Sequence, residues 1–421
     1  MNDLINLYKI PVRGTVSLQS SSVITSFFIS LFIILKSRAH LDGSFDNDVI
    51  ERFSDSLKTI GIDIDQTSFD INLNNVETTY VTQDLLSSYD SINFFYFAII
   101  LLDTQGFVEI KPSKENLDFI NLCKYLGFKV TKAKNVYKIL NVVTTPKESL
   151  TFHENNLNYF LISMLLMFIS NNSFTISTPQ IDYNIAIVLD ILKTLELVSN
   201  VEFGDFVKIQ FSKETYSNKE KYSLKIPGDC AEFIFWIFLT AITNGELKIM
   251  GANSRYYAET LKILSDLGIG FEAVSENEFK VWGSVNLKST KIEIRDDDPH
   301  LELTKLCMVA FTITSNILNL ETLVSLDSKK YKNFISDLNI LGSEIKVNES
   351  DLLILSDPKL KSGDLYLNEN AEYENYAKLL FILGTTTKIN VKYINNLLIY
   401  NSKILLKLSN LGSKLTYATT E

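Results

Sequence analysis

The sequence predicts an α/β protein of two domains, each built from three βαβαββ-like repeats around buried helices. Three observations support this fold class: a marker that recurs about every 70 residues, an apolar segment at the start of each repeat, and the size of the chain. With 421 residues, of which 46% are hydrophobic, the chain can bury two separate cores. A charged fraction of 21% is typical of a globular protein and not of a disordered one.

The recurring marker is a Leu-Gly pair, or its equivalent, that ends a helix-like segment and precedes a strand-like one. The marker glycine falls where the C-terminus of a helix favours a left-handed residue. Successive markers are separated by 66, 69, 72, 74 and 70 residues, and glutamate replaces glycine in the third repeat. Such a period predicts repetition of one supersecondary unit. The six marker residues are Gly61, Gly127, Glu196, Gly268, Gly342 and Gly412.

The order of elements within a repeat is clearest over residues 231–283. There the sequence predicts a buried helix (AEFIFWIFLTAIT), a strand after an Asn-Gly turn (ELKIMG), a second helix (AETLKILSDLG) and a closing hairpin (FEAVSENEFKVWG). A polar segment between the third and fourth repeats predicts the linker. We therefore predict a first domain over 15–212, a linker over 213–221, and a second domain over 222–421 that also includes 1–14. A solenoid is the alternative, but solenoid repeats usually span about 20–50 residues.

Four apolar runs raise the question of a membrane protein. They cover 23–35, 92–102, 159–169 and 231–242, and each has 11–13 residues. A bilayer span needs about 20 residues, so these runs predict helices buried in a soluble core. The N-terminus lacks the basic, apolar and small-residue pattern of a secretory signal, so we expect a cytoplasmic protein without membrane contact.

The basic residues are almost all lysine, because only five of the 40 are arginine. A net charge of −10 and so few arginines argue against a nucleic-acid partner, since phosphate backbones need clustered cations. The three cysteines and three histidines are widely spaced and form neither a disulfide pattern nor a metal motif. We expect no metal and no cofactor. The five arginines are Arg13, Arg38, Arg52, Arg255 and Arg295.

Three segments resemble motifs of the enolpyruvyl transferases, and of the 5-enolpyruvylshikimate-3-phosphate (EPSP) synthases most closely. Residues 225–249 (KIPGDCAEFIFWIFLTAITNGELKI) resemble PGD-x-S-S-A-x-F-x-x-A-A-A, residues 177–197 resemble SKPYIDxTLxLMxxFGV, and residues 323–345 resemble LRVKESDRIxxxxxELxxLGAEI. The resemblance covers nearly the whole chain. It implies a two-domain inside-out α/β barrel that binds its substrates between the domains. The UDP-N-acetylglucosamine enolpyruvyl transferases share the repeats, but their cysteine loop has no counterpart here.

The resemblance also implies a set of substrate-binding positions. EPSP synthases (3-phosphoshikimate 1-carboxyvinyltransferases) of the shikimate pathway, which leads to aromatic amino acids, move an enolpyruvyl group from phosphoenolpyruvate to shikimate-3-phosphate. Their sites hold a carboxylate and two phosphates with lysine and arginine. In this sequence Ser21 stands where the family's GSKSxSNR motif has lysine, and Ser26 where it has arginine. The positions matched as substrate-binding are Ser20, Ser21, Ser22, Ser91, Asp229, Lys329 and Lys330.

Two acids are the candidate catalytic residues. Glu302 aligns with the family's catalytic aspartate, although Asp298 takes that place if the gaps are moved. Asp327 aligns with the glutamate of KE[ST]DR, and Lys329 and Lys330 replace its last two residues. Each candidate acid or serine can instead be a helix cap or a solvated loop residue, and the two lysines can be solvated helix charges.

The family's anion-binding arginines are missing, because the chain has no arginine between 52 and 255. Glutamates near predicted helix N-termini would also repel phosphoenolpyruvate: Glu232, Glu302, Glu372 and Glu374. We therefore hypothesise a degenerate EPSP synthase-like protein, a pseudoenzyme that acts in binding or regulation. One alternative is an active transferase that uses Glu302 and Asp327 as acid and base, with Lys330 holding the anions. Another is a cleft that binds a different, less anionic small molecule. The sequence does not identify a protein partner.

Overall fold

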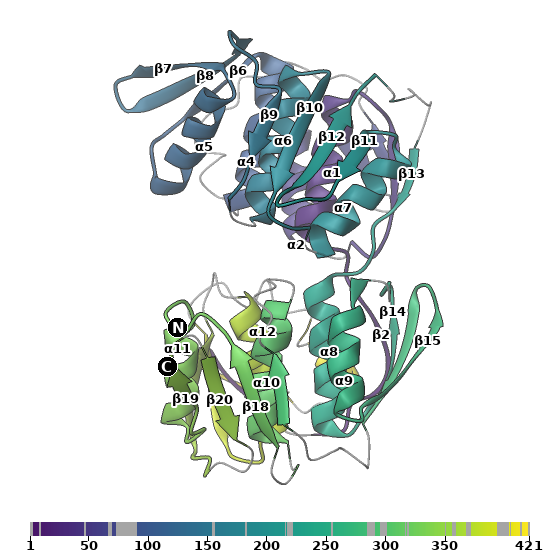
Figure 1. Cartoon of the computed structure of the whole chain (residues 1–421), viewed down its shortest axis with the longest axis vertical. Coiled ribbons are helices and arrows are strands. Elements are labelled where there is room, and N and C mark those ends of the chain that lie inside the picture. The colour runs from purple at the N-terminus through teal and green to yellow at the C-terminus, as the bar shows by residue number, and fades with distance from the viewer. Residues whose placement is uncertain are drawn as a thin grey trace. The chain divides into compact units, whose positions relative to one another are not determined.

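The computed structural model shows a mixed α/β protein that divides into two compact units (Figure 1). Unit 1 comprises Met1–Gln19 and Gly228–Glu421, and unit 2 comprises Ser20–Pro227, so the chain passes between the units twice. The domain limits predicted from the sequence, with a linker over 213–221, stay a prediction. The structure describes residues 3–7, 10–45, 48–65, 70–72, 91–153, 156–181, 183–214, 216, 222–253, 256–283, 291–294, 301–315, 317, 320–349, 351–355, 359–367, 372–393, 404, 406–412 and 415–419.

Unit 2 has three apolar helices in contact with one another at its centre: α1 (Ser22–Ile34), α4 (Ser91–Gln105) and α6 (Leu157–Ser170). Each of these is followed in the chain by one further helix: α2 (Asp48–Lys58), α5 (Lys114–Tyr125) and α7 (Tyr183–Thr194). The sheets have the strand orders β13-β3-β5-β4, β6-β8-β7 and β11-β12-β10-β9. Their strands are β3 (Ala39–Asp42), β4 (Asp63–Asp65), β5 (Asp70–Asn72), β6 (Phe107–Ile110), β7 (Phe128–Ala133), β8 (Val136–Val143), β9 (Ser149–Thr151), β10 (Ser173–Thr178), β11 (Val198–Glu202), β12 (Val207–Ser212) and β13 (Tyr222–Lys225).

Unit 1 is also built around three helices that lie side by side: α8 (Cys230–Thr243), α10 (Glu302–Thr314) and α12 (Glu372–Gly384) (Figure 1). Two shorter helices are α9 (Ala258–Asp266) and α11 (Lys332–Ile340). The sheet orders are β15-β16-β14-β2, β17-β18-β20-β19 and β21-β22-β1-β23. The strands are β1 (Asp3–Leu7), β2 (Arg13–Ser17), β14 (Glu246–Met250), β15 (Gly270–Ser275), β16 (Glu278–Trp282), β17 (Lys291–Ile294), β18 (Glu321–Ser325), β19 (Lys346–Asn348), β20 (Asp351–Leu355), β21 (Gly363–Leu367), β22 (Ile389–Tyr393) and β23 (Leu415–Thr419).

The same strand arrangement recurs in five of these sheets. Each has four strands. One edge strand pairs in parallel with its neighbour, and the other two pairings across the sheet are antiparallel. All six marker residues of the sequence have a positive φ, including Glu196 at 60°. At Gly127 a Cβ would lie 2.4 Å from the Thr145 carbonyl oxygen, so the turn there needs glycine for space as well as for backbone conformation.

The apolar runs form buried helices, as predicted. Every residue of α8 is buried, and hydroxyl groups of α8 and α1 donate to carbonyl groups one turn earlier in the same helix. The Thr240 hydroxyl donates to the Trp236 carbonyl at 2.7 Å, and the Ser30 hydroxyl donates to the Ser26 carbonyl at 2.7 Å. None of the helices that the structure describes is both long and apolar enough to span a bilayer.

Candidate functional site

The N-terminus of α10 brings a carboxylate and a lysine together. Glu302 is the first residue of α10, and its Oε1 lies 2.6 Å from the Lys330 ammonium. The Tyr331 hydroxyl donates a second hydrogen bond to the same oxygen. Glu302 is 22% exposed and Lys330 is 56% exposed, so the pair borders on solvent. Two of the residues predicted from the sequence therefore meet, and they neutralise each other's charge.

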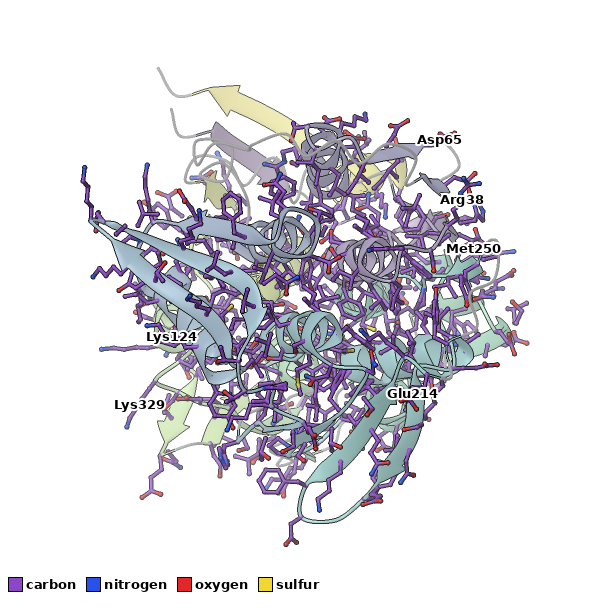
Figure 2. The ribbon with its side chains drawn as sticks, turned by 90° about the horizontal axis from the view of Figure 1, so that it is seen from above. Arg38, Asp65, Lys124, Glu214, Met250 and Lys329 are labelled. Carbon is purple, nitrogen blue, oxygen red and sulfur yellow. The ribbon has the colours of Figure 1, made fainter. Side chains whose placement is uncertain are left out.

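Asp327, unlike Glu302, stabilises a turn of the backbone. Its Oδ1 accepts hydrogen bonds from the backbone N–H groups of Lys329 at 2.9 Å and Lys330 at 3.1 Å. The carboxylate thus holds the turn that leads into α11 and fixes the backbone of Lys330. Lys329 itself is exposed (Figure 2). Asp298, the competing candidate, lies outside the described residues.

A second lysine, which sequence reasoning missed, lies nearby in α12. Lys378 is fully buried, and its ammonium lies 2.7 Å from Asp337 Oδ2 of α11 and 2.9 Å from the Tyr366 carbonyl oxygen. Glu374 lies one turn earlier in α12. The only signal in the sequence is a lysine inside the apolar run YAKLLFILG.

The pKa values in this region reflect burial and crowded negative charge. Burial raises the pKa of Glu374, Lys378 lowers it, and Asp337 raises it further. Burial also raises the pKa of the Tyr331 hydroxyl, as do its hydrogen bond to Glu302 and the charge of that carboxylate. We define the acid–lysine cluster as Glu302, Lys330, Tyr331, Asp337, Glu374 and Lys378. Both of its lysines are ion-paired, and its three acids outnumber them.

The N-terminus of α8 holds two more carboxylates. Asp229 caps the helix, and its side chain accepts the backbone N–H of Glu232 at 2.9 Å. The Asp229 backbone N–H donates to the Gln19 carbonyl at 2.6 Å. Burial raises the pKa of Asp229 to about 6, because water no longer solvates the ionised carboxylate. The cap was one of the two interpretations that the sequence offered for this residue.

Glu232 is not free to repel a ligand, because its carboxylate has three donors. It is 3% exposed and accepts the Gln19 backbone N–H at 2.7 Å and the Trp236 indole N–H at 2.9 Å. The third donor is the ammonium of Lys407, which also donates to the Ser17 carbonyl at 2.7 Å. Sequence reasoning missed Lys407, which lies 175 residues from Glu232 in the chain.

The candidate serines belong to unit 2. Ser20 is 2% exposed, and its hydroxyl donates to the Ile226 carbonyl at 3.2 Å and accepts the Ser44 N–H at 3.2 Å. Ser21 is the N-cap of α1 and accepts the Ile24 N–H at 3.5 Å. Ser22 is the half-buried first residue of α1. Ser91 begins α4, and its side chain is outside the described part of the structure. The hydroxyls of Ser20 and Ser21 are thus engaged within the fold.

No metal centre is apparent among the described residues, where no three histidine, cysteine, aspartate or glutamate side chains are placed to share an ion. The cysteines Cys123, Cys230 and Cys307 are buried thiols. The candidate site therefore consists of the acid–lysine cluster and the N-terminus of α8, and both are rich in carboxylates.

Comparison with known proteins gives a likeness of fold only. No family model and no curated protein matches the chain. Among solved structures, the enolpyruvyl transferase NikO from Streptomyces tendae matches with a TM-score of 0.77 and 12% identity, over 100% of both chains. Two structures of the EPSP synthase from Acinetobacter baumannii match with TM-scores of 0.74 and 0.73 and 10% identity, also over 100% of both chains. The chain has the two-domain fold of these transferases, which confirms the resemblance at the level of the fold.

Proposed function

We propose that this protein has kept the enolpyruvyl transferase fold without the parent reaction, and that it acts as a binding or regulatory protein. The observation that carries the proposal is the ion pair between Glu302 and Lys330 at 2.6 Å. Lys330 stands where the resembled motif has an arginine for substrate anions. In this protein that cation is held by an acid of its own chain.

Binding of phosphoenolpyruvate would require this cluster to rearrange. Lys330 would have to leave Glu302, and the freed carboxylate would then face the incoming phosphate. A hydrogen bond to a charged group contributes about 1.5–3 kcal/mol, and each such bond lost to an internal partner reduces the affinity by tenfold or more. Lys378 offers no replacement, because it is buried against Asp337. Asp229 adds a further carboxylate at the N-terminus of α8, where Glu232 is already paired with Lys407.

Calorimetric titration tests the proposal directly. We expect no saturable binding of phosphoenolpyruvate or shikimate-3-phosphate, alone or together, and no release of inorganic phosphate. Glu302→Gln, which frees Lys330, should leave phosphate release absent and increase the affinity for phosphoenolpyruvate. Glu259→Gln on the exposed side of α9 is the matched control. Saturable binding of both substrates with phosphate release by the unchanged protein would contradict the proposal.

The alternative is an active transferase with an altered site, and the hydrogen bond between Tyr331 and Glu302 favours it. A hydroxyl that donates a hydrogen bond to a carboxylate forms a pair of the kind used in general acid–base catalysis. Glu302 and Asp327 would then be acid and base, and Lys330 would bind anions. Under this alternative the unchanged protein releases phosphate and Glu302→Gln abolishes that release, whereas the first proposal expects no release from either protein. Neither function needs a metal or a cofactor. The absence of both and the cytoplasmic location stay predictions from the sequence.

A further inference from the structure

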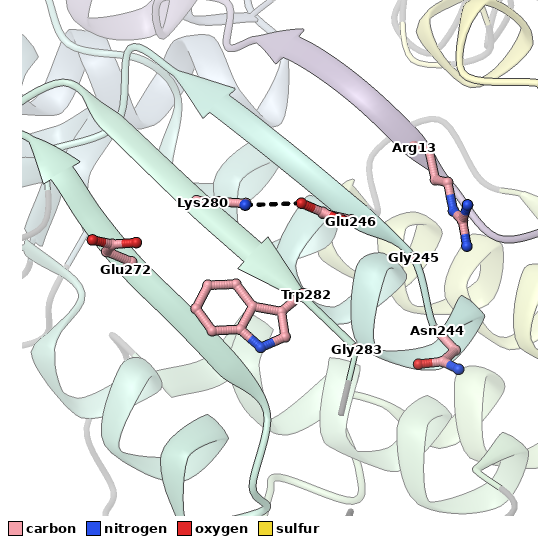
Figure 3. A pocket seen from close by; sticks show the side chains of 8 residues that line it. All are labelled: Arg13, Asn244, Gly245, Glu246, Glu272, Lys280, Trp282 and Gly283. Atoms are coloured by element: carbon pink, nitrogen blue, oxygen red, sulfur yellow. Dashed lines mark ion pairs between the residues drawn. The ribbon is translucent and has the colours of Figure 1, made fainter. Parts of the chain in front are cut away.

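A polar pocket opens on the outer face of the sheet β15-β16-β14-β2 in unit 1 (Figure 3). It has a volume of about 400 Å³. Its lining includes Asn244, which follows the last residue of α8. The 14 residues of α8 span about 21 Å, so the pocket lies at the opposite end of this helix from Asp229. It is separate from the candidate site described above.

Two of the chain's rarest side chains line this pocket. Trp282 is one of two tryptophans, and Arg13 is one of five arginines. The Trp282 indole is 37% exposed, and it packs against its cross-strand partner Gly270, where a Cβ would lie 2.0 Å from the indole nitrogen. Glycine at this position lets the ring rest on the backbone and leaves part of it open to a ligand.

Four charged residues line the pocket, and Arg13 and Glu272 are the two outside the Lys280–Glu246 ion pair. Lys280 forms an ion pair with Glu246 at 2.9 Å, so these two charges neutralise each other (Figure 3). No hydrogen bond or ion pair joins the Arg13 guanidinium to another described residue, and the Asn244 side-chain amide likewise has no hydrogen bond within the described structure. Figure 3 shows both side chains on the same side of the pocket.

Backbone rather than side chains forms part of the pocket wall. Gly245 and Gly283 both belong to the lining. A Cβ on Gly245 would lie 2.2 Å from the Val12 carbonyl oxygen, and one on Gly283 would lie 2.6 Å from the Asn244 Cα. Because these backbone segments pass so closely, neither position can hold a side chain without moving the backbone. No side chain therefore fills the pocket from these two positions.

The chemistry of these groups defines a class of ligand. A guanidinium binds a carboxylate through two parallel hydrogen bonds, and the Glu272 carboxylate can accept hydrogen bonds from hydroxyls. The electron-rich face of an indole attracts the slightly positive C–H groups of a ring, while the amide of Asn244 can donate to and accept from hydroxyls. A volume of about 400 Å³ is near the lower end for small-molecule sites. We propose that this pocket binds a monosaccharide acid, with its carboxylate on Arg13 and its ring on Trp282.

Tryptophan fluorescence gives a direct test, because Trp236 is fully buried and Trp282 is the exposed tryptophan. The probes are glucuronate, glucose, which lacks the carboxylate, and cyclohexanecarboxylate, which lacks the hydroxyls. We expect glucuronate to shift the emission of the full chain saturably, and the other two to bind about tenfold more weakly or less. Arg13→Gln should weaken glucuronate binding about 10- to 100-fold, as expected for a charge-assisted bond. Lys248→Gln, on the same sheet but outside the pocket, should not.

Trp282→Ala should abolish glucuronate binding in calorimetry, with an unchanged circular dichroism spectrum as the check of folding. Three results would overturn the assignment. They are the absence of a saturable response to glucuronate, equal binding of glucose or cyclohexanecarboxylate, and unchanged glucuronate affinity in Arg13→Gln. None of these results depends on whether the protein transfers an enolpyruvyl group.

Discussion

The carboxylate of Glu232 accepts the backbone N–H of Gln19 at 2.7 Å, where the chain is about to leave unit 1 for the first time. The second passage, between Pro227 and Gly228, lies directly before α8. The Gln19 carbonyl accepts the Asp229 N–H at 2.6 Å, so both passages are joined to the same helix N-terminus. Lys407 completes this junction by pairing with Glu232 and donating to the Ser17 carbonyl.

Replacement of Glu232 by glutamine should destabilise unit 1. The amide can keep a hydrogen bond to Gln19, but it leaves the ammonium of Lys407, which is 20% exposed, without its counter-ion. Removing one partner of a buried pair costs about 3–5 kcal/mol, and partial access to water reduces this to about 2–3 kcal/mol. Urea unfolding measures the loss.

The control for this variant is Glu276→Gln, since Glu276 is exposed. The double variant Glu232→Gln/Lys407→Met should recover part of the lost stability, because it removes the unpaired charge as well. A loss no larger than that of the control would mean that the ion pair does not hold the junction.

Asp229 should make stability depend on pH in a defined window. Burial raises its pKa from 3.8 to about 6, so the folded state binds a proton more tightly than the unfolded state between these values. Stability contributed by this group is therefore lost as the pH rises from about 4 to about 6, by an amount on the order of 2–3 kcal/mol. Asp229→Asn keeps a helix cap without a charge.

We accordingly expect Asp229→Asn to match the unchanged protein near pH 4 and to be more stable above pH 6, in urea unfolding measured from pH 4 to pH 8. Asp205→Asn, at an exposed turn position, should show no such divergence. Parallel pH profiles of the Asp229 variant and the unchanged protein would refute this assignment.

Features encoded by neighbouring residues could be predicted from the sequence. The left-handed markers such as Gly127 and the buried helix α8 follow from local patterns of glycine and apolar residues. The capping roles of Ser21 and Asp229 are likewise local and were among the interpretations offered. Contacts between distant segments could not be predicted. Neither the pairing of Glu232 with Lys407 nor that of Lys378 with Asp337 leaves a periodic signal. The sequence therefore drew attention to Glu232 but to none of the other three residues.

Lys378→Met should reveal how far α11 and α12 depend on their shared ion pair. Methionine fills the buried space of the lysine stem but removes the bonds to Asp337 and to the Tyr366 carbonyl. Because Asp337 is 28% exposed and water can solvate it, we expect a loss of about 1–3 kcal/mol at neutral pH. Lys332→Met, at an exposed position of α11, is the control.

Adding Asp337→Asn to Lys378→Met should restore part of the stability, since no unpaired carboxylate then remains at this position. Urea unfolding of the four proteins completes the double-mutant cycle. A coupling energy near zero would show that the two side chains lie close together without stabilising the packing of α11 against α12.

The effect of Gly270→Ala on stability should change sign with the residue at position 282. Gly270 does not have a positive φ, so its backbone accepts alanine, which on its own stabilises by about 0.4–1 kcal/mol through the unfolded state. With Trp282 present, however, the added Cβ would lie 2.0 Å from the indole nitrogen. Displacing the ring costs about 1–3 kcal/mol, so we expect a net loss of stability in the unchanged background. In the Trp282→Ala background the obstacle is gone, and the same substitution should stabilise.

Thermal unfolding of the four proteins measures this reversal, and tryptophan emission reports whether the ring has moved. Gly204→Ala is the control, because the nearest atom to its added Cβ is 3.8 Å away in both backgrounds. If Gly270→Ala has the same effect with and without the indole, Trp282 does not rest on this strand. The pocket would then lose the wall on which its ring-binding surface depends.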